Sequence, residues 1–186
     1  MGFDGKEYQS RFDSLEAQGK DIHGEATFVR SFTPSSVLDA GCGTGRVARE
    51  LAVHGIDVVG VDVDRSMISE ARRLGVSLEW IEHDLVTLQL QRTFDVVLLA
   101  GNVPLFCPAD QRAALIGSCA AHIGDGGFMI SGFQVGIDRG CGQFQLKEFD
   151  AACEASNLVL RERFSTWDRQ EFEKDLHYAV SVHVLS

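Results

Sequence analysis

A cluster of glycines is the clearest candidate for a ligand-binding site in this chain. Gly41, Gly43 and Gly45 follow the apolar run 37–40, and a helical pattern begins directly after them. Glycine adopts positive φ angles and lets a ligand approach the backbone closely. The start of a helix adds unpaired N–H groups and a partial positive charge, which suit a carboxylate or a phosphate. Residues 37–45 and the pattern after them therefore predict a strand, a ligand-binding loop and a helix.

Two acidic residues narrow the choice of ligand. Asp62 ends the next apolar run, where its carboxylate can accept hydrogen bonds from both ribose hydroxyls of a nucleoside. A dinucleotide of the NAD type needs a glycine at position 46, where this chain has Arg46. Asp39 adds a negative charge beside the loop, which repels a pyrophosphate and attracts a ligand with an ammonium and a sulfonium. These charges favour S-adenosylmethionine over NAD.

The elements that must position these residues alternate along the chain. From position 36 onward, strand-length apolar runs alternate with helical patterns, which is typical of βα units that build a parallel sheet. Strands are predicted at 36–39, 57–62, 77–83, 94–100 and 128–133, with Gly124–Gly127 as a turn before the last of them. Residues 158–167 and 177–185 alternate apolar and polar side chains, which predicts half-exposed antiparallel edge strands after a helix at 146–156.

The first 33 residues have a different pattern from the rest. Their apolar residues recur at helical spacings and indicate two short amphipathic helices broken near Gly19. A chain of 186 residues suits one domain with a substantial core. We therefore expect a single domain over 1–186, with a helical segment at 1–33 and a Rossmann-like α/β core at 34–186.

The segment Val37-Leu-Asp-Ala-Gly-Cys-Gly-Thr-Gly45 resembles motif I of the class I S-adenosylmethionine-dependent methyltransferases. Asp62 matches the acid that ends the second strand in that family, and the likeness extends over residues 36–133. The resemblance implies a doubly wound seven-stranded sheet of order 3-2-1-4-5-7-6, with strand 7 antiparallel and helices on both faces. It also implies an N-terminal helical lid over the cofactor and transfer of a methyl group from S-adenosylmethionine.

The resemblance assigns roles to further residues around the cofactor. Asp84 would accept a hydrogen bond from the adenine amino group, and the Leu85 N–H would meet a ring nitrogen. Val63 and Met67 would enclose the adenine, although Met67 also fits the core side of the following helix. The predicted cofactor-binding residues are Arg11, Asp39, Gly41, Cys42, Gly43, Gly45, Asp62, Val63, Met67, Asp84, Leu85, Ala100 and Asn102.

Catalysis at a sulfonium carbon depends largely on alignment and desolvation, so the chain needs few catalytic residues. His23 is the candidate base if the acceptor must lose a proton, with a solvated or capping side chain as the alternative. The acceptor should enter beyond the end of the fourth strand, where Asn102 could instead only shape the turn. The predicted acceptor contacts are Tyr8, His23, Asn102 and Phe106.

Composition excludes several other kinds of protein. The 27 acidic and 17 basic side chains give a formal charge of −10, which opposes binding to nucleic acid or to an anionic membrane. The five cysteines show neither a C-x-x-C pair nor zinc spacing, so we expect reduced thiols and no metal. No signal region and no apolar run of ~20 residues is present, which predicts a cytoplasmic protein.

The sequence thus predicts an S-adenosylmethionine-dependent methyltransferase, as a monomer or homodimer, that acts on a small-molecule acceptor. Methylation at oxygen, nitrogen or carbon stays open. The alternatives are an NAD-dependent oxidoreductase and a module that binds an adenosyl ligand without catalysis.

Overall fold

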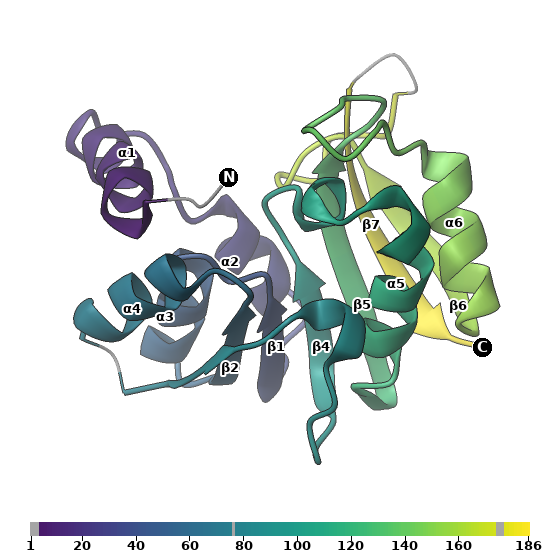
Figure 1. Cartoon of the computed structure of the whole chain (residues 1–186), viewed down its shortest axis with the longest axis horizontal. Coiled ribbons are helices and arrows are strands. Elements are labelled where there is room, and N and C mark those ends of the chain that lie inside the picture. The colour runs from purple at the N-terminus through teal and green to yellow at the C-terminus, as the bar shows by residue number, and fades with distance from the viewer. Residues whose placement is uncertain (1–3, 76, 174–176) are drawn as a thin grey trace.

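The computed structural model describes residues 4–75, 77–173 and 177–186. They form one sheet with helices on both sides (Figure 1). The strands are β1 (Ser36–Ala40), β2 (Asp57–Asp62), β3 (Glu79–Glu82), β4 (Phe94–Leu99), β5 (Ile123–Gln134), β6 (Leu158–Phe164) and β7 (Tyr178–Leu185). The α-helices are α1 (Gly5–Ala17), α2 (Gly24–Arg30), α3 (Arg46–Val53), α4 (Arg65–Arg73), α5 (Arg112–Ala120) and α6 (Leu146–Ala155). Short 3₁₀ helices are η1 (Leu85–Thr87), η2 (Val103–Phe106) and η3 (Ala109–Gln111).

The strand order is β3-β2-β1-β4-β5-β7-β6. β1 pairs in parallel with β2 and β4, and the parallel pairing continues from β2 to β3 and from β4 to β5. β7 runs antiparallel to both β5 and β6. This arrangement confirms the predicted fold class and the order that the family resemblance implied.

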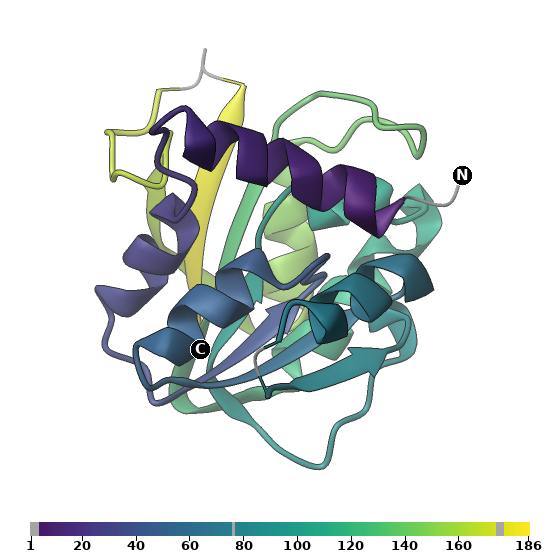
Figure 2. The same ribbon diagram turned by 90° about the vertical axis from the view of Figure 1, so that its left-hand side faces the viewer.

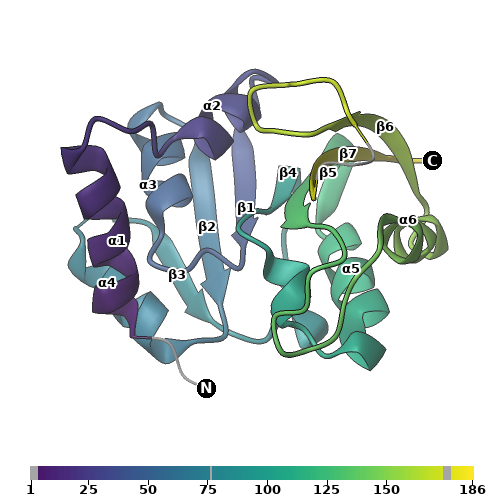
Figure 3. The same cartoon turned by 90° about the horizontal axis from the view of Figure 1, so that it is seen from above.

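Two apolar clusters cover the faces of the sheet. Successive strand residues point to opposite faces, so Val37 packs with α2, α3 and α4 whereas Leu38 packs with α5 and α6. β4 is almost wholly apolar because helices cover it on both sides, as is usual for a parallel sheet. The polar ends of these strands are thereby left at the carboxyl edge of the sheet, which Figure 3 shows from above.

The prediction that β7 is a half-exposed edge strand is wrong. β7 lies between β5 and β6, and its residues 179–183 are buried. Ser181 accepts a hydrogen bond from Arg163 at 2.8 Å, and His183 is only 1% exposed. The alternation in the sequence therefore comes from polar side chains that are buried rather than solvated. β6 is the edge strand.

β5 begins earlier than the sequence predicts. Residues 124–127, expected as a turn, belong to the strand. The pairing with β4 shifts register between Phe94 and Val96, where the glycine-rich segment adds residues to one strand only. This bulge explains why a strand can pass through a segment with turn composition.

The two predicted N-terminal helices are confirmed as α1 and α2. Asp4 caps α1, because its carboxylate accepts hydrogen bonds from the amides of Lys6 and Glu7 at 2.9 and 3.1 Å. Figure 2 shows α1 lying across α3 and α4, above the carboxyl edge. Residues 1–3 of the predicted lid lie outside the described residues.

Candidate active site

The glycine loop joins β1 to α3 and is fixed to the end of β2. The amides of Gly41 and Cys42 both donate to the Val61 carbonyl, at 2.8 and 2.9 Å. A Cβ at Gly41, where φ is +84°, would lie 2.3 Å from a methyl of Val103. The loop therefore has no space for a side chain at this position, so glycine is required there.

Asp39 lies beneath this loop and is almost completely buried. Its exposed fraction is 2%, and its Oδ2 atom has no hydrogen-bond partner among the described residues. Burial raises the pKa of the Asp39 carboxyl to about 7, although Arg46 nearby opposes the shift. The backbone N–H of Ala48 also bonds to this carboxyl, but a buried carboxylate oxygen without a partner is costly, so the position is suited to a cation.

Asp62 stands beside the loop at the end of β2. Its Oδ2 accepts from the Gly43 amide at 2.8 Å, and its Oδ1 accepts from the Asp64 amide at 2.8 Å. Burial raises the pKa of Asp62, and these two amide hydrogen bonds oppose the rise. Asp39 thus lies in the strand that leads into the glycine loop, and Asp62 contacts the loop from the end of the neighbouring strand.

The residues assigned to adenine follow β2 and β3. Val63 is 67% exposed, whereas Met67 is buried in α4, so Met67 has the core position that the sequence left open. Asp84 caps η1 by accepting from the Val86 amide at 2.9 Å, and Leu85 is buried. Asp84 and Val63 therefore stand at the surface after two neighbouring strands.

Asn102 forms the turn after β4, beyond the buried Ala100. Its backbone is left-handed, with φ at +70°. Its side-chain oxygen accepts from the Gln134 amide at 2.7 Å, and its own amide donates to the Gly132 carbonyl at 3.2 Å. Asn102 therefore shapes the turn, as the sequence allowed, by joining it to the end of β5. Phe106, farther along, is 45% exposed.

Helix α1 contacts the glycine loop through a buried polar pair. The Thr44 hydroxyl donates to the Gln9 side-chain oxygen at 2.7 Å. The neighbouring Tyr8 lies over Gly43, where a Cβ would be 3.5 Å from the tyrosine ring. Tyr8, which the sequence predicted as an acceptor contact, thus lies at the loop, while Gln9 and Thr44 were not singled out from the sequence.

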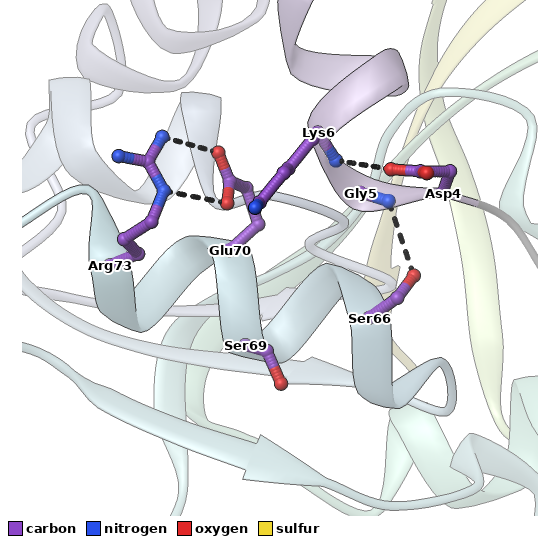
Figure 4. Close-up of a pocket in the computed structure, with 7 residues that line it drawn as sticks. All are labelled: Asp4, Gly5, Lys6, Ser66, Ser69, Glu70 and Arg73. Atoms are coloured by element: carbon purple, nitrogen blue, oxygen red, sulfur yellow. Dashed lines mark hydrogen bonds and ion pairs between the residues drawn. The ribbon is translucent and has the colours of Figure 1, made fainter.

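The first turn of α1 packs directly on α4. The Gly5 amide donates to the Ser66 hydroxyl at 3.2 Å, and a Cβ at Gly5 would lie 2.5 Å from the Ser66 carbonyl oxygen. Figure 4 shows the small pocket beside this contact, where the ion pair between Glu70 and Arg73 on α4 faces Lys6. The start of α1 is therefore held by backbone contact rather than by apolar side chains.

Arg46 connects the start of α3 to the N-terminal segment. Its guanidinium lies 4.5 Å from the centre of the Phe12 ring and donates to the Ile22 carbonyl. It also forms a bidentate ion pair with Glu25, at 2.7 and 3.0 Å. Arg46, which replaces the third glycine of the NAD fingerprint, thus holds α1 and α2 against the end of the loop.

Two predicted site residues pair elsewhere. Arg11 is exposed and forms an i,i+4 ion pair with Glu7 at 2.9 Å. The imidazole of His23 faces Glu50 on α3, with 3.6 Å between Nδ1 and the nearer carboxylate oxygen. The structure therefore does not bring Arg11 or His23 to the loop, because Arg11 pairs with Glu7 on α1 and His23 faces Glu50 on α3.

Arg112, which the sequence did not indicate, joins the two segments that follow β4 and β5. It is only 4% exposed and donates to the carbonyls of Cys107, Cys141, Gly142 and Gln143 at 2.7–3.2 Å. A planar guanidinium can satisfy several carbonyls at once, which a lysine cannot. This side chain therefore fixes the segment after η2 against residues 141–143.

A glycine loop between β1 and α3, an acid at the end of β2 and this strand order define an α/β protein that binds a nucleoside. Residues 37–127 match the family described as a methyltransferase domain. The TehB-like S-adenosylmethionine-dependent methyltransferase from Corynebacterium glutamicum is 31% identical, with 98% of each chain covered and a TM-score of 0.89. The chain belongs to the class I S-adenosylmethionine-dependent methyltransferases, and its cofactor is S-adenosylmethionine.

Curated relatives match a shorter part of the chain. A cypemycin N-terminal methyltransferase from a Streptomyces species is 36% identical over 110 residues, which are 56% of this chain and 45% of the relative. The dTDP-3-amino-3,4,6-trideoxy-alpha-D-glucopyranose N,N-dimethyltransferase of Streptomyces venezuelae is 30% identical over 126 residues, or 66% and 52% of the two chains. The chain spans about half the length of these relatives. The comparisons give no support to the NAD-dependent alternative.

Two features are lacking in the described part of the chain. None of its helices has the length and apolar character needed to cross a membrane. No group of three or more histidine, cysteine or acidic side chains there is arranged to hold a metal ion.

Proposed function

We propose that this chain transfers the methyl group of S-adenosylmethionine to a small-molecule acceptor. The observation that carries the proposal is the pair of carboxylates at the glycine loop, the buried Asp39 before it and the half-buried Asp62 bonded to it through the Gly43 amide. The unpartnered oxygen of Asp39 suits a ligand of positive charge, and Asp62 suits a diol. When bound, S-adenosylmethionine supplies a methyl group already activated by the positive sulfur.

The proposed cofactor contacts are those sequence assignments that are compatible with the positions of the residues in the structure. Asp62 would hold the ribose, and Asp84 with the Leu85 amide would hold the adenine between Val63 and Met67. The methionine portion would lie along the glycine loop and the turn after β4, against Gly41, Cys42, Gly43, Gly45, Ala100 and Asn102. Arg11 is left without a role in this proposal because its guanidinium pairs with Glu7.

Residues 1–33 would act as a lid in a single-domain protein whose core spans 34–186. The contact of Tyr8 with Gly43 and the pairing of Gln9 with Thr44 support this role, because both cover the loop. With α1 docked in this way, cofactor exchange would require the helix to move. The lid would then exclude water during methyl transfer.

The acceptor class is supported by the names of the relatives and by charge. The Streptomyces venezuelae relative is named for a sugar nucleotide, and several others are ubiquinone biosynthesis O-methyltransferases of Coxiella burnetii. The charge of −10 argues against a nucleic-acid acceptor. A small acceptor fits both lines of support, and the atom that receives the methyl group stays open.

Two measurements test the proposal. Calorimetry should show binding of S-adenosylhomocysteine and none of NADH, and S-adenosylhomocysteine should be released when a small-molecule extract is added with S-adenosylmethionine. Binding of NADH alone would contradict the cofactor site. Cofactor binding without release under any extract would favour a non-catalytic binding module.

A further inference from the structure

We infer that the acceptor binds within a ring of side chains above the ends of β1 and β4, and that Tyr178 positions it there. This inference rests on the proposed function and deepens it. Figure 3 shows the segments that supply the ring around the carboxyl edge: α1, α2, the start of α3, residues 165–173 after β6, and the start of β7. We call this set the edge ring; it comprises Tyr8, Phe12, Glu25, Arg46, Trp167 and Tyr178.

The first half of the edge ring starts at the glycine loop. Tyr8 lies over Gly43, and its ring meets Phe12 edge-on with 5.2 Å between the ring centres. The Arg46 guanidinium covers the other ring at 4.5 Å and pairs with Glu25 at 2.7 Å. These contacts lead without interruption from the loop to α2.

The second half leads from α2 to β5. A Cβ at Gly24, the neighbour of Glu25, would lie 3.7 Å from the Cβ of Trp167. The Trp167 indole N–H donates to the Tyr178 hydroxyl oxygen at 3.1 Å. Both rings also crowd Gly132, where a Cβ would lie 2.2 Å from Trp167 and 2.8 Å from the Tyr178 oxygen. Tyr178 is thereby fixed beside the end of β5.

The turn after β4 closes the ring. The Asn102 amide donates to the Gly132 carbonyl at 3.2 Å, and the next residue, Val103, lies against Gly41. The contacts therefore return to the glycine loop where they began. The circuit passes through the residues that follow β1 and β4, two paired parallel strands at whose ends the methyl group would be presented.

Tyr178 has hydrogen-bonding capacity directed away from Trp167. An indole N–H can only donate, so it occupies one lone pair of the phenol oxygen and leaves the O–H and a second lone pair. Burial raises the pKa of both Tyr8 and Tyr178, so both phenols keep their protons at neutral pH. The chain has only two tyrosines, and both belong to the edge ring. The ring therefore offers neutral hydroxyl groups rather than a base.

The charges around the edge ring define the class of acceptor. Glu25 neutralises Arg46, the one cation of the edge ring, while Asp39 and Asp62 face the bound cofactor. The ring therefore offers an anionic acceptor no unpaired cation, and its aromatic faces attract a cation. The acceptor should be a small uncharged or cationic molecule with a hydroxyl or amine close to the reacting atom.

The test compares Tyr178→Phe with wild type in two assays. S-adenosylhomocysteine release from S-adenosylmethionine, in the presence of a small-molecule extract, should fall about tenfold or more because a hydrogen bond to the acceptor is lost. The affinity for S-adenosylhomocysteine should stay within about twofold of wild type. Ser131→Ala is the matched control, because this buried hydroxyl on β5 has no hydrogen-bond partner among the described residues and lies next to Gly132 on the opposite face of the sheet. The control should keep the wild-type rate of S-adenosylhomocysteine release and the wild-type affinity for S-adenosylhomocysteine.

A second arm tests the charge of the acceptor. The extract is passed over an anion-exchange resin at neutral pH, and the acceptor should stay in the unbound fraction. Wild-type turnover in Tyr178→Phe, or turnover only with the resin-bound fraction, would overturn this inference while leaving methyl transfer intact. Absence of turnover by wild type itself would instead overturn the proposed function and, with it, this inference.

Discussion

The hydroxyl of Thr44 donates a 2.7 Å hydrogen bond to the side-chain oxygen of Gln9, and both residues are buried, at 1% and 7% exposure. The bond joins a residue between two glycines of the loop to the middle of α1. Because these side chains are polar, the contact can exchange with water when the helix moves. We therefore propose that this hydrogen bond holds the lid closed over the glycine loop.

Replacing Gln9 by alanine should loosen the lid. The change leaves the buried Thr44 hydroxyl without its acceptor, at a cost of ~1–3 kcal/mol. S-adenosylhomocysteine should dissociate roughly tenfold faster, as measured by stopped-flow fluorescence. Ser14→Ala, on the exposed face of α1, should leave the rate unchanged. Equal dissociation rates for the Gln9 variant and wild type would show that the pair does not hold the cofactor in place.

Gly5→Ala distinguishes the packing of α1 on α4 from the intrinsic stability of the α1 helix, because the change affects the two in opposite directions. Alanine improves helix propensity, yet its Cβ would lie 2.5 Å from the Ser66 carbonyl and push α1 away from α4. Hydrogen exchange in α1 should therefore become faster in this variant. Lys6→Ala changes an exposed residue in the same turn to alanine and should not have this effect. Unchanged or slower exchange in Gly5→Ala would contradict the close packing of the two helices.

Arg46→Gly restores the glycine of the NAD fingerprint but should not create an NADH site. The variant leaves Glu25, 18% exposed, without its bidentate partner and removes the contact with Phe12. Loss of one partner of such a pair should lower Tm by roughly 5–10 °C, as calorimetry would show. Gain of NADH affinity at an unchanged Tm would mean that Arg46 only blocks a dinucleotide.

Asp39 should make stability and cofactor binding depend on pH. The pKa of Asp39 in the folded protein is about 7, above its ordinary value of 3.8, so the folded state holds a proton that the unfolded state has lost. Asp39 should therefore reduce stability as pH rises from about 4 to about 7, and Asp39→Asn should remove this contribution. Denaturant unfolding at several pH values measures it, and an identical pH slope in the variant would contradict it.

The same carboxyl should release a proton when the cationic cofactor binds. At pH 7 about half of the folded molecules carry the Asp39 proton, so binding of S-adenosylmethionine should release up to about half a proton. Calorimetry in buffers of different ionisation enthalpy counts these protons. Asp39→Asn should reduce the count, and an equal count in both proteins would assign the proton to another group.

The glycine loop and the alternation of strands and helices could be predicted from the sequence because their signals are local, whereas the strand order came from the family resemblance. The loop glycines follow their strand directly, and Asp62 ends the next strand, so a short window contains each signal. The hydrophobic pattern of Phe94–Leu99 likewise identifies a strand that is covered on both faces. Each of these features depends on neighbours in the chain.

The remaining features depend on packing between distant segments. Gln9 and Thr44 have nothing in their own surroundings to mark them as partners, and neither do Trp167 and Tyr178. His183 was assigned to a half-exposed strand because a polar residue in an alternating pattern usually faces water, whereas α6 covers it. Such contacts are fixed only once the sheet brings its strands together.

Calorimetric titration of Asp62→Ala with S-adenosylhomocysteine tests the central claim most directly. Loss of the two ribose hydrogen bonds, ~1.5–3 kcal/mol each, should weaken binding about a hundredfold or more. Asp57→Ala is the matched control, because Asp57 lies at the opposite end of β2, where it is exposed and pairs with Arg92. The account predicts a large loss for Asp62→Ala and none for Asp57→Ala. Wild-type affinity in Asp62→Ala would contradict the placement of the cofactor at this loop.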